Sequence, residues 1–347
     1  MTSSVSVVIP CYNYGHFLGA AIASALDDQP GMEVRVLVID DASTDGSAEV
    51  ARAIADRDPR VQVLAHATNR GHIATYNEGL LDWADGDYTV LLSADDRLAP
   101  GALRRAAELL DAHPEVGFAY GHPIRFREGT PPPAARTTVR GWSVWPGLWW
   151  AERRCRSGVS CISSPEVVVR TSVQKMVGGY DPLLPHTGDT EMWLRLAAHA
   201  DVGYIRGADQ AYYRMHESNM TKARTTLVDL RQRRLAYETF LDRCATGLPE
   251  AARLSGIVHR KLCREALWSA SRAYDRGRTE QTPVDELIAF ALDCWPQARR
   301  MGVYRGLRLR TRLGPRVVPC LQPFVLSAVG RKVQSRLWWW SWARRGL

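Results

Sequence analysis

The sequence predicts an α/β protein, in which a mostly parallel sheet is followed by a helical C-terminal extension. Over the first 120 residues, short apolar runs alternate with amphipathic stretches, which is typical of βαβ units. Acid pairs directly follow two of the apolar runs, and parallel sheets bind their ligands at the carboxyl ends of strands. From about residue 225 onward, apolar residues recur only at helical spacing.

The elements of the first half follow from this alternation. Pro59 ends the second helix and Pro100 begins the fourth. The expected strands are residues 5–9, 34–39, 61–65, 88–92 and 116–120, and three of the expected helices are residues 17–26, 72–83 and 100–112. The remaining helix is expected to be capped by Ser43 or Asp45, to run through residues 50–55 and to stop before Pro59.

Residues 129–150 interrupt the pattern with three consecutive prolines, three glycines and four tryptophans. This composition predicts a mobile loop or flap. Residues 204–205 and 212–214 are expected to form strands, and the helical spacing is clearest over residues 227–241 and 262–274.

The composition indicates a globular protein of the cytoplasm. Of 347 residues, 46% are hydrophobic, which is enough to bury a core. The seven cysteines are scattered without a C-x-x-C pair, so neither a disulfide framework nor a zinc cluster is expected. The N-terminus lacks the features of a signal peptide, and no apolar run is long enough to span a membrane.

The charge is divided unevenly along the chain. Residues 1–220 carry 20 Lys and Arg against 27 Asp and Glu, whereas residues 221–347 carry 25 against 10. The net charges of −7 and +15 imply different partners. The last segment combines basic residues with Trp338–340 and Trp342, which predicts peripheral membrane contact; a packed or disordered tail is the alternative. No recognition helix or RNP pattern indicates nucleic-acid binding.

Four motifs in order resemble the inverting family 2 glycosyltransferases of bacteria, which have the GT-A fold, a Rossmann-like nucleotide-diphospho-sugar transferase fold. The resemblance covers roughly residues 3–220, and the segments that carry it are residues 5–15, 38–47, 93–96 and 188–196. It implies a catalytic domain over residues 1–222, with a nucleotide-binding half (1–120) and an acceptor half (121–222). Residues 223–347 would then form a basic helical extension.

The resemblance implies a Mn²⁺ or Mg²⁺ site in the segment Ser93-Ala-Asp-Asp, because a departing diphosphate needs a hard cation and hard cations prefer carboxylate oxygen. Asp96 would ligate the metal, and Asp95 would contact the ribose or the water shell of the metal. His216 is a further candidate metal ligand. The alternatives are a solvated Asp-Asp turn and a structural histidine.

The nucleotide would bind at the first two motifs. By the resemblance, Asp41 accepts a hydrogen bond from uracil, and Pro10 and Tyr12 flank the base, with Asn13 in the same loop. Stacking alone does not select a nucleobase, so the preference for UDP depends on the resemblance. Arg70 follows the third strand, where a cation could meet phosphate; the alternative is a solvated arginine.

Asp189 is the candidate catalytic base that removes the acceptor proton. Family members often read Glu-Asp at this point, but here Gly188 replaces the Glu, so a second carboxylate is missing unless Glu191 supplies it. Asp189 also lies where a helix is expected to begin, so it could serve as a helix cap as well.

The expected function is transfer of a sugar from a nucleoside diphosphate to a hydroxyl or amine of a glycan, a lipid-linked acceptor or a small natural product. The Trp-rich loop and residues 160–165 would contact the acceptor. Two alternatives remain. One is a sugar nucleotidyltransferase, although its Gly-rich, lysine-bearing phosphate loop is missing, and the other is a non-catalytic sugar-nucleotide-binding scaffold, which Gly188 favours.

Overall fold

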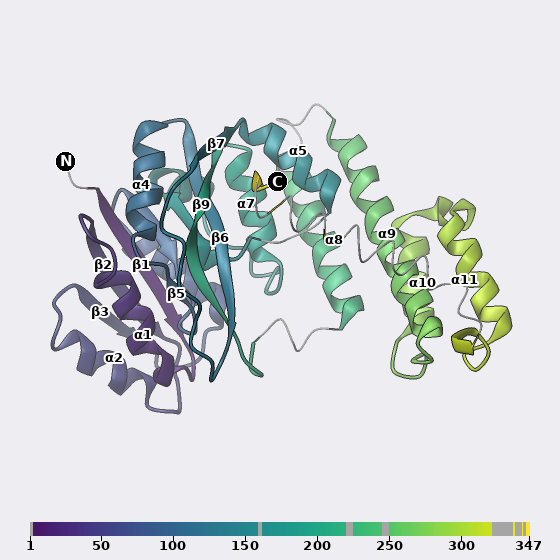
Figure 1. Ribbon diagram of the computed structural model, residues 1–347, viewed down its shortest axis with the longest axis horizontal. Helices are drawn as coiled ribbons and strands as arrows, with labels where there is room; N and C mark the ends of the chain where they lie inside the picture. The colour runs from purple at the N-terminus through teal and green to yellow at the C-terminus, as the bar shows by residue number, and fades with distance from the viewer. Residues whose placement is uncertain are drawn as a thin grey trace. The chain divides into compact units, whose positions relative to one another are not determined.

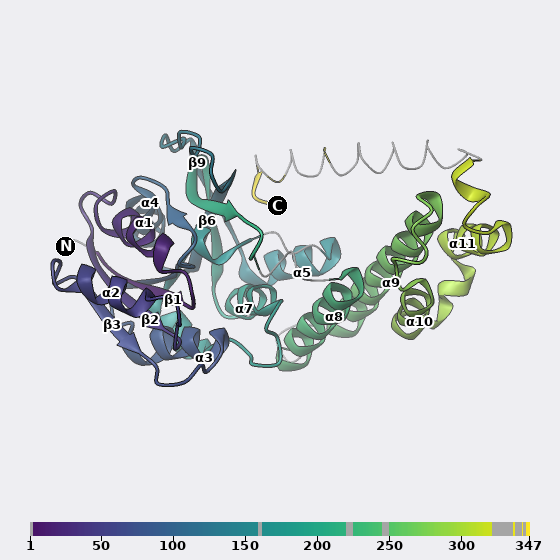
Figure 2. The same ribbon diagram turned by 90° about the horizontal axis from the view of Figure 1, so that it is seen from below.

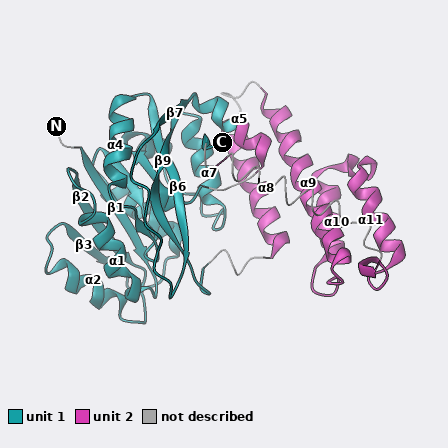
Figure 3. Ribbon diagram, in the orientation of Figure 1, with its two compact units in different colours: residues 1–151, 161–219, 343–347 teal, residues 152–160, 220–342 magenta. Residues whose placement is uncertain are grey.

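The computed structural model describes residues 3–158, 162–219, 225–244 and 250–320, and positions 336, 342 and 345–347 of the C-terminal segment. These residues form two compact units (Figure 3). The first unit comprises residues 1–151, 161–219 and 343–347, and the second comprises residues 152–160 and 220–342.

The first unit is built on one sheet with the strand order β3-β2-β1-β4-β8-β6-β9-β5, and β7 pairs with β9 outside this path (Figure 1). The strands are β1 (Ser4–Cys11), β2 (Glu33–Asp40), β3 (Val61–Ala65), β4 (Tyr88–Leu91), β5 (Arg97–Leu98), β6 (Val116–Arg127), β7 (Gly141–Trp145), β8 (Val167–Arg170) and β9 (Asp201–Met215). Strands β1 to β4 pair in parallel, and β8 then pairs antiparallel with both β4 and β6.

The parallel half is buried on both faces, as its continuous apolar runs predict. In β1, the residues from Val5 to Ile9 are all buried, and in β2 the same holds from Val36 to Asp40. The helices of the first unit are α1 (Gly15–Leu26), α2 (Ser47–Ala55), α3 (His72–Asn77), η1 (Glu78–Trp83), α4 (Ala102–Ala112), η2 (Ser164–Glu166), α6 (Thr171–Val177) and α7 (Gly188–Ala197). Helix α5 (Gly147–Ser157) contains the boundary between the units.

The predicted flap over residues 129–150 is wrong in its second half. Residues 141–145 form β7, which pairs antiparallel with β9, and α5 begins at Gly147. The first half of the segment is held by an ion pair between Arg136 and the buried Asp209 of β9. Among the tryptophans, Trp150 is fully buried and its indole N–H donates to the Tyr120 hydroxyl. The second half of this segment is therefore part of the packed fold.

The second unit is helical, as predicted. Helix α9 packs against α8, α10 and α11 (Figure 2). Its elements are α8 (Thr226–Arg243), α9 (Ala251–Asp275), α10 (Val284–Cys294), η4 (Pro296–Arg300), α11 (Gly302–Leu313) and η5 (Val318–Cys320). None of the helices in the described ranges combines the length and the apolar character that crossing a bilayer requires. The tail residues Arg331, Lys332, Trp338–340 and Arg344 lie outside the described residues, so membrane contact by the tail stays a prediction.

Candidate active site

The two acid pairs lie at the same edge of the sheet. Strand β1 pairs in parallel with β2 on one side and with β4 on the other. The backbone N–H of Asp41 donates to the carbonyl of Cys11 at the end of β1. Asp95 and Asp96 follow β4 by only a few residues. The carboxyl ends of neighbouring strands thus bring both acid pairs to one edge, as the sequence predicted.

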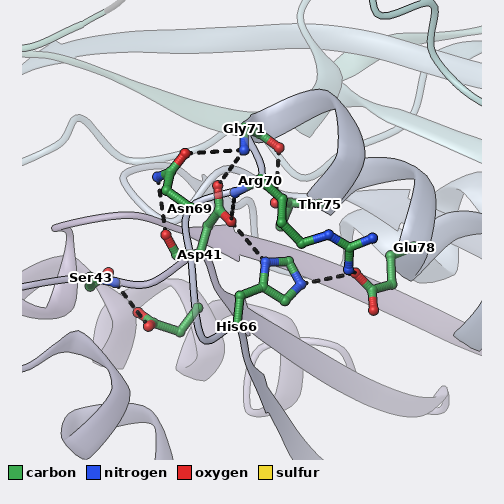
Figure 4. A network of polar contacts seen from close by, with 9 residues as sticks. Asp41, Ser43, His66, Asn69, Arg70, Gly71, Thr75 and Glu78 are labelled. Carbon is green, nitrogen blue, oxygen red and sulfur yellow. Dashed lines mark hydrogen bonds and ion pairs between the residues drawn. The ribbon is translucent and has the colours of Figure 1, made fainter.

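Asp41 is the centre of a network of polar contacts formed with the loop that follows β3 (Figure 4). Its Oδ1 accepts from the backbone N–H of Arg70 at 2.7 Å and lies 2.7 Å from Nδ1 of His66. Its Oδ2 accepts from the backbone N–H of Gly71 at 2.9 Å. Burial alone would raise the pKa of Asp41, but these hydrogen bonds outweigh burial and lower it. The carboxyl group is therefore held ionised and in a fixed orientation.

His66 connects Asp41 to a second acid. Its other ring nitrogen, Nε2, lies 2.9 Å from the Glu78 carboxylate, and its side chain is only 5% exposed. Glu78 also accepts from the guanidinium group of Arg70 at 2.8 Å. The Arg70 side chain is half exposed, although its guanidinium group is paired with Glu78.

The loop between β1 and α1 presents an aromatic ring to solvent. Tyr12 is 49% exposed and Pro10 is partly buried. Asn13 has a left-handed φ of 59°, and its side-chain oxygen accepts from the backbone N–H of Thr44. Because this contact fixes the loop against the turn after β2, Tyr12 and Asp41 are carried on one rigid platform.

Asp95 and His216 lie together at the end of β9. The His216 Nε2 lies 2.8 Å from Oδ2 of Asp95, and the Asn219 amide lies 3.4 Å from the same oxygen. The structure brings His216 to Asp95, whereas Asp96 accepts from the backbone N–H of Arg214 at 2.8 Å.

The guanidinium group of Arg214 is fixed beside the acid pair. It lies 4.5 Å from the ring centroid of Phe17 and 4.7 Å from that of Phe126. The backbone between the two acids is tied to the same residue, because the Arg214 Nε donates to the Asp95 carbonyl.

The acid pair has the chemistry of a cation site. Burial, and then the negative charge of Asp95, raises the pKa of Asp96 well above its ordinary value. A cation would relieve this repulsion. Within the described ranges, no three acidic, His or Cys side chains are grouped tightly enough to enclose a metal alone. The carboxylates of the acid pair nevertheless fit a hard cation, because such ions commonly take only one or two carboxylates and complete their shell with substrate phosphates and water.

Asp189 lies in the first turn of α7 and is partly exposed. The hydroxyl of Tyr180 hydrogen-bonds to its carboxylate. The ring of Tyr180 also explains why residue 188 is a glycine, because a Cβ at this position would lie 2.9 Å from Cδ1 of Tyr180. Glu191 does not replace the missing carboxylate, since it is fully buried and pairs with Arg195 at 2.8 Å.

Two side chains are influenced by the charge of Asp189 and by that of the acid pair. Burial raises the pKa of Tyr76, and the charges of Asp189 and of the Asp95–Asp96 pair raise it further. Burial likewise raises the pKa of Glu166 well above its ordinary value, with further contributions from Asp189 and Asp96. Because Coulomb interactions weaken with distance, these pKa directions are consistent with a shared site, which stays a prediction.

Glu166 is a residue that the motifs did not identify. It is 1% exposed, and neither carboxylate oxygen has a hydrogen-bond partner in the described part of the chain. It ends η2, which packs against β4, β6 and β9. The sequence feature that could have identified Glu166 is its position, since it is a single acid between residues 160–165 and the apolar run Val167-Val-Val. Ser160 and Cys161 themselves lie outside the described residues.

The fold is that of the GT-A glycosyltransferases. The structure is similar to Staphylococcus aureus TarS, residues 1–349, solved in complex with UDP-GlcNAc: the TM-score is 0.61 at 19% identity, over 94% of this chain and 92% of that chain. It is also similar to the mannosyltransferase PcManGT of Pyrobaculum calidifontis, solved with GDP-Man and Mn²⁺, with a TM-score of 0.51 at 15% identity over 86% of this chain and 88% of that chain. These likenesses confirm the predicted fold class.

Residues 6–161 match the family model described as "Glycosyl transferase family 2", and this part of the chain belongs to that family. A relative in Haemophilus influenzae, described as an uncharacterized glycosyltransferase, is 38% identical over 101 residues, which are 29% of this chain and 40% of that protein. Two further curated relatives are matched over 14% and 30% of their own length. The chain thus spans less than half of these relatives.

Proposed function

We propose that the chain is an inverting, metal-dependent glycosyltransferase that transfers a sugar from a nucleoside diphosphate, UDP in the first instance, to a hydroxyl or amine group. The supporting observation is that both acid pairs follow neighbouring parallel strands at one edge of the sheet. In addition, the charges of Asp189 and Asp96 both raise the pKa of Tyr76 and the pKa of Glu166. We assign residues 1–222 to the catalytic domain and residues 223–347 to a helical extension.

The donor would bind along the edge formed by β2, β1 and β4. The exposed ring of Tyr12 would stack on the nucleobase beside Pro10, and the fixed carboxylate of Asp41 would accept its imide N–H. Arg70 would approach the phosphates with its exposed guanidinium group. Similar proteins solved with UDP-GlcNAc and GDP-Man support a nucleotide-sugar donor.

Asp95, Asp96 and His216 would hold a Mn²⁺ or Mg²⁺ ion, which would neutralise the charge that develops on the departing diphosphate. The side chain of His216 is 4% exposed and that of Asp95 is 12% exposed, so the protein fixes both groups before the donor arrives. PcManGT, which has a similar fold, was solved with Mn²⁺.

Asp189 would act as the general base. Its carboxylate takes the proton of the acceptor hydroxyl while the acceptor oxygen forms a bond to the anomeric carbon. The bond from that carbon to the phosphate oxygen breaks, and the nucleoside diphosphate leaves with the electron pair. A single displacement inverts the anomeric centre. Tyr180 would orient the base through its hydrogen bond to Asp189.

The test is Asp189→Asn, which keeps the shape of the side chain and removes its basicity. We expect UDP release from a panel of UDP-sugars, with Mn²⁺ and acceptor, to fall at least about a hundredfold while donor affinity changes little. Asp56→Asn, an exposed substitution in the same unit, is the control.

Near-normal turnover by Asp189→Asn would refute the assigned base. Release of pyrophosphate from a nucleoside triphosphate would favour a nucleotidyltransferase, and binding of UDP-sugars without any turnover by the wild type would favour a scaffold.

A further inference from the structure

The helical second unit contains a cavity that the proposed transfer reaction does not use. The cavity has a volume of about 760 Å³ and lies between α9, η4 and α11. All its lining residues belong to the second unit. Four of them are arginines, two are tryptophans and none is acidic. This lining is unusual for an accidental gap between helices, because it gathers like charges in one concave site.

Three of the arginines are free to bind a ligand. Arg260 and Arg264 lie one turn apart on α9, and Arg300 ends η4. In the part of the chain that the structure describes, no hydrogen bond or ion pair engages these three guanidinium groups. The fourth arginine, Arg310, differs because its guanidinium group donates to Asp275 at 2.7 Å and 3.3 Å. The cavity therefore carries three uncompensated positive charges.

The pKa of a neighbouring lysine on α9 indicates a positive electrostatic potential around this helix. Burial lowers the pKa of Lys261, and the charges of Arg264 and Arg233 lower it further. From Arg299 onward, the sequence has 12 basic residues and no acid that could neutralise them. Guanidinium groups bind phosphate through paired N–H donors, so an anionic phosphate is the group that fits this wall.

The tryptophans supply flat apolar faces in the same cavity. Trp268 follows Arg264 by one turn, and the guanidinium carbon of Arg264 lies 5.9 Å from its ring centroid. Trp295 is partly buried in the wall formed by η4. On α11, Gly302 leaves open space, since an added Cβ would meet no atom within 4 Å. Indole rings stack on the apolar faces of sugar rings, so the cavity has room and a surface for a saccharide.

We propose that this cavity binds a phosphate-bearing saccharide. Arg260, Arg264 and Arg300 bind the phosphate, and the two indoles contact the sugar ring. A single small ligand fits better than a membrane surface, because Trp268 and Trp295 are partly buried in the wall of the cavity, whereas bilayer contact uses aromatic rings on an exposed face. The site is separate from the proposed transfer chemistry and does not depend on it.

The test uses isothermal titration calorimetry on the full chain with glucose 1-phosphate, in excess UDP and Mn²⁺ so that the nucleotide site is filled. Free glucose, inorganic phosphate and vesicles containing phosphatidylglycerol are titrated in parallel. The variants are the double substitution Arg260→Gln/Arg264→Gln and the single substitution Trp268→Ala. The matched control is Arg305→Gln/Arg308→Gln, which removes two exposed charges of α11 that do not line the cavity.

We expect glucose 1-phosphate to bind the wild type and the control alike, and the double variant to bind at least about tenfold more weakly, because each charge-assisted hydrogen bond contributes about a factor of ten. Trp268→Ala should bind glucose 1-phosphate no better than inorganic phosphate. Equal binding by wild type and double variant would overturn the proposal. Equal affinity of the wild type for inorganic phosphate and glucose 1-phosphate would also overturn it, and so would arginine-dependent binding of vesicles alone, which would assign the cavity to a lipid headgroup.

Discussion

Glu166 combines complete burial with two carboxylate oxygens for which the described residues supply no hydrogen bond of normal geometry. Its pKa is raised well above the ordinary value of 4.5, so the folded chain keeps a proton that the unfolded chain loses as the pH rises. The wild type therefore loses stability with rising pH above about 4.5 through this group. We expect Glu166→Gln to unfold at higher urea concentration than the wild type, with a difference that grows from pH 5 to pH 9. The slope should approach about 1.4 kcal/mol per pH unit below the folded pKa.

Comparison with Glu115→Gln separates the contribution of Glu166 from the general pH dependence of stability. Glu115 is an exposed acid, and its replacement should leave the pH dependence of the urea midpoint close to that of the wild type. Parallel midpoint curves for wild type and Glu166→Gln would show that Glu166 has an ordinary pKa in the folded protein.

His66 contacts the carboxylate of Asp41, which we propose to bind the nucleobase. Without its ring, Asp41 would lose one of three groups that fix its orientation. We expect His66→Ala to raise the donor KM about tenfold while kcat changes little, since the loss of one charge-assisted hydrogen bond costs about 1.5 kcal/mol in binding. The measurement is steady-state UDP release at several donor concentrations.

The control for His66 is His113→Ala, because His113 is ion-paired with Glu115 and packs against Trp142. A fall in kcat without a change in KM would place His66 in the chemical step and contradict a role in holding Asp41.

Residues with a local sequence signal could be predicted, and residues defined only by the tertiary structure could not. Asp41 and Asp95 directly follow apolar runs, so their place at the sheet edge follows from strand order. The pairing of His216 with Asp95, rather than with Asp96, depends on how β9 crosses the sheet. Glu166 has no motif at all, because its special state arises from burial by β4, β6 and β9.

At the scale of elements, Gly147 fixes the start of α5. A Cβ at Gly147 would lie 2.0 Å from the carbonyl oxygen of Ala197 and 2.1 Å from that of Ala200. We expect Gly147→Ala to destabilise the protein by about 3 kcal/mol, because backbone atoms must move apart. Thermal or urea unfolding measures the change.

Gly19→Ala, a substitution within helix α1, is expected to have the opposite effect on stability. Gly19 is exposed in α1, and an added Cβ meets nothing within 4 Å, so this substitution should stabilise the protein by about 0.5–1 kcal/mol. If both glycine substitutions changed the free energy of unfolding in the same direction, close packing at Gly147 would not be the determining factor.

The elements with regular spacing were predicted well, and the irregular segment was not. Residues 61–65 were expected as a strand and form β3, since a short apolar run bounded by turns admits little else. Residues 141–145 were expected in a flap, because proline, glycine and tryptophan obscure the alternation of a strand. Their pairing with β9 supplies the order that local sequence does not indicate.

At the scale of the whole molecule, each of the two units buries its own apolar core. Leu18 and Val36 are fully buried in the first unit, and Leu262 and Leu267 are fully buried in the second. We expect two calorimetric unfolding transitions. UDP with Mn²⁺ should raise the midpoint temperature of only one transition. When UDP is present at a hundred times its Kd, the shift should correspond to about 2.7 kcal/mol of added stability.

Asp41→Ala, which removes the proposed nucleobase contact, should reduce that shift. A single transition that UDP moves as a whole would show that the two units unfold cooperatively.

The helical spacing of the apolar residues predicted the helical nature of the second unit, whereas the division of charge along the chain predicts different partners and stays a prediction. The cavity between α9 and α11 was not predictable, because Arg264, Trp268 and Arg300 come together only through helix packing. The tail from residue 321 lies largely outside the described residues, so its proposed role depends on sequence alone.

The ring of Tyr180 beside Gly188 also constrains how this enzyme can change. Because a Cβ at position 188 would meet that ring, introducing the glutamate found in many family members should be tolerated only together with a smaller residue at position 180. The two positions should therefore behave as an epistatic pair, and the order of substitution would matter: shrinking Tyr180 first releases its hold on Asp189, whereas replacing Gly188 first displaces the ring.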